Sequence, residues 1–378
     1  MGAGLALAGG IVLLLAISNW IGRSPGWAYD FHAYYDAALR LIATGTPYQA
    51  ETLGGPFRPG PFGLYLYSPV PALFFMPLTS LGEPAAVVVW LALRVGLLVV
   101  ACALMPVPRA VRLATLGIAG LSAPVLFDLN LGNVSLIVTF FAVLVWRYLD
   151  RPIGSIALAA SLTMRPTMAL IGGWWVLRGL WRPVLWTAAA GLAILVATLP
   201  FVGIERWLEL VTVLRNVSNV TGVRANLDLG SSVLLMGGPL WLAQVWLYAG
   251  YVVAGGAVLL SLRRDRELSF VVTVMATLFL SPLLWDHYLT NLLIPAAFLA
   301  SRGRWWGLLL PLLCWSPQLL AIIFPGLRGV AEFVLVYIAL AGLLLPFLAP
   351  HRGERAGTLL DRLAAWRARR RTTEPARA

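Results

Sequence analysis

A succession of apolar segments, separated by short gaps rich in arginine, determines what this chain folds into. Sixty per cent of its 378 residues are hydrophobic and 12% are charged, whereas about a quarter of a soluble domain is charged. About twenty apolar residues cross a bilayer as a helix, and several segments here are shorter and must be tilted or partly buried. The sequence therefore predicts an all-α, polytopic membrane protein of about twelve transmembrane helices. Its apolar segments are 2–21, 85–107, 110–127, 133–149, 152–164, 166–178, 183–203, 240–262, 268–285, 288–301, 305–324 and 331–349.

The placement of arginine predicts the orientation in the membrane. The net charge of +12 comes from arginine alone among the basic residues, because the sequence contains no lysine. Since positive residues concentrate in cytoplasmic loops, the arginine clusters and both termini are expected in the cytoplasm. This pattern favours membrane orientation over nucleic-acid binding. The clusters lie at 109/112, 147/151, 178/182, 263/264/266, 302/304 and from 352 onward.

A single transmembrane domain is expected over residues 1–350, followed by a basic cytoplasmic tail over 351–378. Segment 2–21 lacks a basic start, which favours a retained first span over a cleaved signal peptide. Residues 68–82 contain three prolines and are predicted to be interfacial or re-entrant. The alternative is an external N-terminus with 69–82 spanning the membrane.

Most polar residues outside the arginine clusters fall at the external face in this topology, largely in loops 22–68 and 204–230. A polar layer over an apolar bundle predicts a functional site at that surface. Cys102 and Cys314 lie in apolar segments, where cysteine behaves as a small hydrophobe, so neither a disulfide nor a metal site is predicted. The candidate site residues are Asp30, His32, Tyr34, Asp36, Arg58, Tyr67, Asn133, Arg165, Arg215, Asp286 and His287.

The first external loop is predicted to contain an amphipathic helix lying on the membrane surface. Gly45 and Pro47 end the helix, and Asp30 is placed to cap its N-terminus. An alternative role for Asp30 is that of a general base, since a carboxylate at the membrane boundary can accept a proton. The apolar face comprises Phe31, Tyr35, Ala38 and Ile42, and the polar face comprises His32, Asp36 and Arg40.

Two kinds of role remain open for the candidate cations. Arg165 is either an interfacial anchor or a phosphate ligand, because guanidinium matches phosphate oxygens in a bidentate manner. Arg58 and Arg215 are weaker candidates for phosphate. Arg94 lies midway along a predicted span, where a charge is functional by default, although a structural partner or snorkelling explains it as well.

Asp286 and His287 follow a tryptophan at the external end of a predicted span. The pair serves either as part of the site or as a surface cap. No metal is predicted there, because no DxD, HExxH or CxxC pattern accompanies the pair.

Five stretches in this order and spacing resemble glycosyltransferase family 87, a group of polytopic enzymes of the GT-C superfamily. The likeness covers residues 1 to about 300. The chain is similar to the bacterial α-1,2-mannosyltransferases and related arabinosyltransferases of this family, which use polyprenyl-phosphate sugars. The stretches are "DFHAYYDAALRLIATGTPYQ", "YLYSPVPALFFMPLTSL", "LGNVSLIVTFFAVL", "SLTMRPTMALIGGWW" and "LSPLLWDHYLTNLLIPA".

The resemblance implies a catalytic aspartate at Asp30 and an external histidine at His287. It also implies a bacterial inner-membrane enzyme of cell-envelope glycolipid biosynthesis. Where relatives often have Gly-Gln before the asparagine, this chain has Leu131 and Gly132, which puts a polar contact there in doubt. Where they often have Lys-Pro, Arg165 keeps the charge.

An inverting mannosyl transfer from a polyprenyl-phosphate donor is the expected function, with no cofactor. Its partners would be that donor, a glycolipid or glycan acceptor and membrane lipids. A phosphate leaves readily when cations stabilise its charge, so one base and one or two arginines suffice, whereas glycosidases need a second carboxylic acid. The rival is a multi-span transporter or flippase, for which only Arg94 has a midplane position. A catalytically inactive scaffold is a third possibility.

Overall fold

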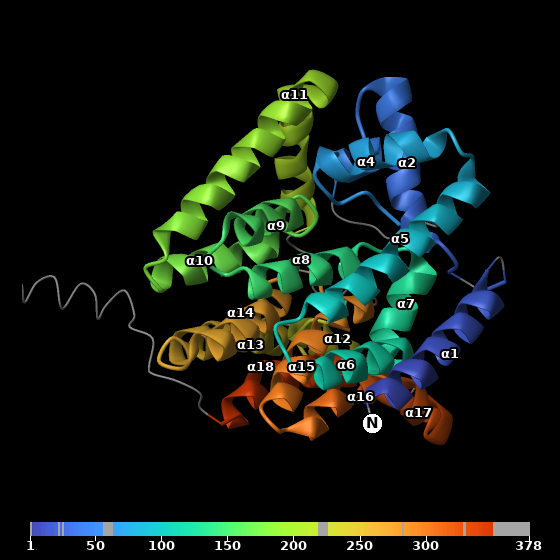
Figure 1. Ribbon diagram of the computed structural model, residues 1–378. Coiled ribbons are helices and arrows are strands. Elements are labelled where there is room, and N and C mark those ends of the chain that lie inside the picture. The colour runs from blue at the N-terminus through green and yellow to red at the C-terminus, as the bar shows by residue number, and fades with distance from the viewer. Residues whose placement is uncertain are drawn as a thin grey trace, which may run out of the picture.

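Helices make up all the regular secondary structure in the computed structural model, which describes residues 2–21, 23–24, 26–55, 63–217, 226–281, 283–327 and 330–350 (Figure 1). Each of the twelve predicted apolar segments is helical. In the first half of the chain the helices are α1 Gly2–Trp20, α2 Tyr29–Thr44, α3 Ala50–Gly54, α4 Pro69–Thr79, α5 Glu83–Leu104, α6 Arg109–Leu121, α7 Ala123–Leu131, α8 Ser135–Arg147, α9 Pro152–Leu162, η1 Pro166–Met168 and α10 Ala169–Leu177. In the second half they are α11 Trp181–Val217, α12 Leu229–Leu235, α13 Leu240–Ser261, α14 Arg266–Phe279, η2 Asp286–Leu292, α15 Leu293–Ser301, η3 Trp305–Leu308, α16 Leu309–Leu313, α17 Ser316–Ile323, η4 Pro325–Leu327, η5 Ala331–Phe333, α18 Val334–Leu344 and η6 Leu345–Leu348.

Five helices in the described part of the chain are long and apolar enough to cross a membrane, and up to seven if each of two bent pairs counts as one span. The chain is thus a multi-pass membrane protein, but the predicted number of about twelve spans is not confirmed. The physical reason is length, because α8 has 13 residues and α9 has 11, whereas a straight span needs about 20. The predicted basic tail over 351–378 lies outside the described residues.

The long helix α11 does not end where the sequence predicts a loop. Residues 204–217, assigned to the external loop 204–230, continue the helix beyond a bend at Gly203. Gly203 has φ of 67°, a conformation that glycine adopts without strain, and Pro200 removes a backbone donor just before it. The bend lets the second half of α11 lie near α3 and α4 (Figure 1).

Helix α2 is amphipathic as predicted, but Asp30 is not its N-cap. Ala28 holds the cap position with φ of 59°, without a side-chain cap, and Asp30 lies in the first turn. The backbone N–H of Ala28 donates to the carbonyl of Asn130 at 2.9 Å, which ties the start of α2 to the end of α7. Gly45 ends the helix in the left-handed conformation, as predicted. The side chain of Asp30 is therefore not used in capping.

Helix α1 packs against α6 through glycines that leave no room for a side chain. A Cβ atom on Gly117 would overlap the backbone of Leu5, and one on Gly9 would overlap the backbone of Gly117. Small residues permit this close approach between helices in a membrane, where packing rather than the hydrophobic effect holds helices together. The first span is thus fixed to the bundle by backbone contact.

We predict that Gly117→Ala destabilises the protein by about 1–3 kcal/mol, the usual cost of overpacking. The measurement is the thermal unfolding midpoint in detergent. Gly10→Ala is the matched control, because no atom lies within 4 Å of its added Cβ and alanine favours the helix. Equal midpoints for the two variants would contradict the packing explanation.

Candidate functional site

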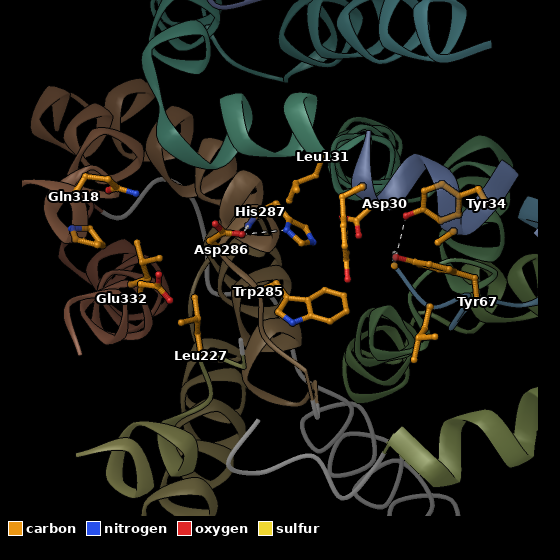
Figure 2. A pocket seen from close by; sticks show the side chains of 16 residues that line it. Asp30, Tyr34, Tyr67, Leu131, Leu227, Trp285, Asp286, His287, Gln318 and Glu332 are labelled. Carbon is orange, nitrogen blue, oxygen red and sulfur yellow. Dashed lines mark hydrogen bonds and ion pairs between the residues drawn. The ribbon is translucent and has the colours of Figure 1, made fainter. Parts of the chain in front are cut away.

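One cavity of about 270 Å³ brings together residues from the two ends of the chain (Figure 2). Helix α2 and the segment before α4 supply one end, and η2, α17 and η5 supply most of the other polar residues. Single residues come from α7, the segments before α12 and η2, and α18. Of the candidate residues, five line it: Asp30, Tyr34, Tyr67, Asp286 and His287. The remaining lining residues are Tyr29, Ala33, Gly63, Leu64, Leu131, Leu227, Trp285, Pro317, Gln318, Glu332 and Leu335.

Asp30 is held in place by Asn133, which follows the turn that ends α7. The Asn133 amide donates from Nδ2 to Asp30 Oδ2 at 3.0 Å and lies 3.5 Å from the hydroxyl of Tyr67. That hydroxyl accepts a hydrogen bond from Tyr34 at 3.0 Å. Asn133 is fully buried, whereas Asp30 is only partly buried and faces the cavity. The carboxylate is therefore oriented by one firm hydrogen bond and remains reachable by a ligand.

The environment of Asp30 favours a basic carboxylate. Burial raises the pKa of Asp30 above its ordinary value, while the positive charge of His287 and the hydrogen bond from Asn133 oppose the rise. The nearby carboxylate of Asp286 raises it again. A carboxylate with a raised pKa binds a proton more strongly, which is what a general base requires.

His287 faces Asp30 across the cavity, as Figure 2 shows. Its Nδ1 lies 3.1 Å from Asp286 Oδ1, and its backbone N–H donates to the same oxygen at 2.6 Å. Burial alone would lower the pKa of His287, but the hydrogen bond to Asp286 and the charge of Asp30 outweigh it, and the pKa is raised. Its Nε2 is buried and has no hydrogen-bond partner in the structure. This nitrogen is available to a ligand.

Arg165 lies behind Asn133 and connects to Asp30 through a chain of hydrogen bonds. Arg165 Nη2 donates to Ser135 Oγ at 2.8 Å, and Ser135 Oγ donates to Asn133 Oδ1 at 2.8 Å. The guanidinium stacks on Tyr288, with 3.6 Å between the guanidinium carbon and the ring centroid. Arg165 is 5% exposed, and its buried Nη1 has no partner. One buried, charged N–H group is thus left for an anion to satisfy.

Arg94 fixes the turn that presents Asn133. From α5 it donates to the carbonyl of Asp128 at 2.6 Å and to that of Leu129 at 3.0 Å, and it pairs with the Asp128 carboxylate at 3.4 Å. Trp90, one turn earlier, donates to the carbonyl of Gly132 at 2.7 Å. These bonds satisfy the last carbonyls of α7 with a cation, which suits the negative end of a helix. The role left open for Arg94 by its sequence position is resolved as structural support.

The remaining candidates do not line the cavity. On the far side of α2, His32 lies 3.6 Å from Glu83 and Asp36 is half-exposed. Arg215, near the end of α11, is exposed. Arg58 lies outside the described residues. Direct roles in substrate binding for these four residues stay predictions.

Sequence reasoning missed the C-terminal part of the cavity wall. Gln318 and Glu332 stand in apolar surroundings of α17 and η5, and no motif joins them to the other polar residues. A polar side chain isolated within an apolar segment was the available signal. Ser135 and Tyr288 were also missed as partners of Arg165, although Ser135 stands two residues after Asn133 in the same quoted stretch.

Comparison with known proteins gives one match. A family model described as Glycosyltransferase family 87 matches residues 65–285, more than half of the chain. No curated protein and no solved structure gives a significant match. The matched segment contains Tyr67, Asn133 and Arg165, while Asp30 and His287 join them through the fold.

We predict that Arg94→Met destabilises the protein by about 3–5 kcal/mol, because it leaves the Asp128 carboxylate buried without a cation. Chemical unfolding in detergent measures the change. Arg23→Met, at an exposed position, is the matched control and should change stability by less than about 0.5 kcal/mol. The double variant Arg94→Met/Asp128→Leu should recover part of the loss, since no charge is then left unpaired. A double variant as unstable as the sum of both single variants would contradict this account.

Proposed function

Because this chain belongs to glycosyltransferase family 87 and is therefore a membrane glycosyltransferase, we propose that it transfers mannose from a polyprenyl-phosphate donor. The acceptor is a lipid-linked or cell-envelope glycan. The observation that supports this proposal most directly is the geometry around Asp30. The Asp30 carboxylate, with a raised pKa, faces a histidine across the cavity, and an arginine with an unsatisfied N–H lies behind it.

Asp30 acts as the general base in this proposal. Its carboxylate takes the proton of the acceptor hydroxyl while the acceptor oxygen forms a bond to the anomeric carbon. The bond between that carbon and the phosphate oxygen breaks, and its electron pair stays on the phosphate. Attack in line with the leaving group inverts the anomeric configuration. The products are the new glycoside, polyprenyl phosphate and protonated Asp30.

The leaving phosphate needs positive charge near it, and two groups are suited to supply it. Arg165 Nη1 and His287 Nε2 are both buried and unpartnered, so an anion would satisfy hydrogen-bonding capacity that the protein leaves open. Arg58 and Arg215 are weaker candidates for the same phosphate. Tyr34 and Tyr67 line the cavity, where the sugar would contact them.

The membrane location follows from the donor in this proposal. A polyprenyl chain lies among the helices, and the sugar is presented at the external face of a bacterial plasma membrane, with both termini in the cytoplasm. A GT-C arrangement with about twelve membrane segments, several of them short, fits this placement. The many exposed apolar side chains on α11 and α13 suit contact with lipid tails.

The alternative function, that of a transporter, has less support from the structure than from the sequence. Arg94, its one midplane candidate, is bound by the carbonyls of Asp128 and Leu129 and by the Asp128 carboxylate. A group whose hydrogen bonds are taken up by the end of a helix is poorly suited to bind and release a substrate.

We predict that Asp30→Asn lowers sugar transfer by about 10²–10⁴-fold, because the amide cannot accept the acceptor proton. The assay follows radiolabelled sugar from polyprenyl-phosphate-mannose, and separately from the arabinose donor, into membrane glycolipid. Asp150→Asn is the matched control, since Asp150 forms a surface ion pair with Arg266 and such pairs contribute little. Wild-type rates in a folded Asp30→Asn protein would rule out this base, and no transfer by the wild type with either donor would contradict the donor assignment.

The pH dependence of transfer gives a second test. A base works deprotonated, so the rate falls as the pH drops through the pKa of Asp30, and the raised pKa places this fall above the range of an ordinary carboxylate. Asn133→Ala removes a hydrogen bond that lowers the pKa. We therefore expect the acid limb of kcat/KM to move to higher pH in this variant. The control Asn19→Ala, exposed on α1, should leave the limb in place; an unmoved limb in Asn133→Ala would contradict the assignment.

A further inference from the structure

The cavity extends well beyond the residues assigned to proton and phosphate chemistry. Figure 2 shows Asp30, Tyr34 and Tyr67 at one end, Asp286 and His287 in the middle, and Gln318 with Glu332 at the other end. Gln318 comes from α17 and Glu332 from η5, both beyond the segment that matches the family model. This far end is therefore built by a part of the chain to which the proposed function assigns no role.

The far end is poorly suited to an anion. Glu332 there is a carboxylate, Asp286 in the middle is a carboxylate paired with His287, and no arginine occurs among the described residues that line the cavity. Arg165, by contrast, offers a phosphate a partner outside this wall. Carboxylate and amide oxygens instead accept hydrogen bonds from hydroxyl groups. The chemistry suits a neutral ligand that carries several hydroxyls.

A buried polar atom at the far end lacks a partner. Gln318 Oε1 is buried and forms no hydrogen bond in the structure. His287 Nε2 is unpaired too, but the proposed function assigns it to the phosphate. A buried polar group without a partner is unfavourable, so a hydroxyl that pairs with Gln318 would bind favourably. Gln318 lies at the opposite end of the cavity from Asp30 (Figure 2).

Apolar surfaces complete the wall. Trp285 lies along the middle of the cavity, and Pro317 and Leu335 line it beside Gln318 and Glu332. A sugar ring has apolar C–H faces as well as hydroxyl edges, and it packs on surfaces of this kind while its hydroxyls reach polar side chains. The wall thus offers both contacts that a sugar ring needs.

We infer that Gln318, Glu332 and Asp286 form a subsite for a neutral sugar ring, separate from the phosphate position. The inference rests on the proposed sugar transfer and names which part of the cavity selects the sugar. The same chemistry serves either the transferred sugar or the sugar of the acceptor. Gln318 and Glu332 are then specificity-determining residues.

Direct binding tests this subsite without relying on catalysis. The probes are octyl α-mannoside, octyl α-arabinoside and octyl phosphate, measured against full-length protein in nanodiscs. We expect Gln318→Ala and Glu332→Gln to weaken binding of at least one glycoside by fivefold or more and to leave octyl phosphate unchanged. Gln244→Ala and Glu51→Gln, at exposed positions of α13 and α3, are the matched controls.

The outcomes separate this inference from the proposed function. We expect Asp30→Asn to lose transfer but still bind the glycoside, a result that agrees with both the proposed function and the subsite. Wild-type transfer by Asp30→Asn would overturn only the role of Asp30 as general base. Equal glycoside binding by wild type, Gln318→Ala and Glu332→Gln would overturn the subsite. A loss of octyl phosphate binding as large as the loss of glycoside binding would overturn it too.

Steady-state transfer then identifies which sugar occupies the subsite. A KM raised only for the donor assigns it to the transferred sugar, and a KM raised only for the acceptor assigns it to the acceptor sugar. Unchanged KM values for both substrates would overturn the subsite.

Discussion

The site depends on the hydrogen bonds that the buried guanidinium of Arg94 donates to the end of α7. A helix that ends within an apolar bundle leaves its last carbonyls without partners, and such groups cannot be left unsatisfied away from water. Arg94 and Trp90 supply donors to the end of α7 from the neighbouring helix α5. The fixed turn in which α7 ends presents Asn133 to Asp30, while Asn130 holds the first residue before α2. A cation deep in an apolar helix thus determines where the carboxylate stands.

Close packing reinforces that turn. Gly132 has φ of 84°, and a Cβ atom there would lie 2.7 Å from Cβ of Phe31, too close for any other residue. Phe31 is fully buried and stacks on Tyr35, so the apolar face of α2 rests directly on the turn. Asp30 directly precedes Phe31 in α2, so its backbone cannot shift without moving this contact. Its orientation is therefore set by packing as well as by the hydrogen bond from Asn133.

The apolar segments, the end of α2 at Gly45 and the nearness of Asp30 to His287 were all predictable from the sequence. Periodicity and glycine placement are local signals, and the arginine pattern predicts that both polar stretches lie at the same face of the membrane. The pairing of Arg94 with Asp128 was not predictable, because it joins residues 34 positions apart without a motif. The N-cap prediction for Asp30 failed because Ala28 is held by a distant carbonyl, a tertiary contact that overrides local capping preference. The predicted number of about twelve spans is not confirmed, because several apolar segments fold into helices too short to cross straight through.

Charge movement in the proposed reaction indicates what the buried cation Arg165 would contribute. In the proposed reaction the donor phosphate carries one negative charge, and Asp30 carries another. When the acceptor proton reaches Asp30, that carboxyl becomes neutral and the departing polyprenyl phosphate becomes a dianion, so one unit of negative charge moves from base to leaving group. Arg165 is hydrogen-bonded through Ser135 and Asn133 to Asp30, and in the proposed reaction its unpaired Nη1 holds the phosphate, so one cation would serve both ends of this movement. A fixed positive charge in a water-poor site stabilises such a transfer because it needs no reorganisation as the charge arrives.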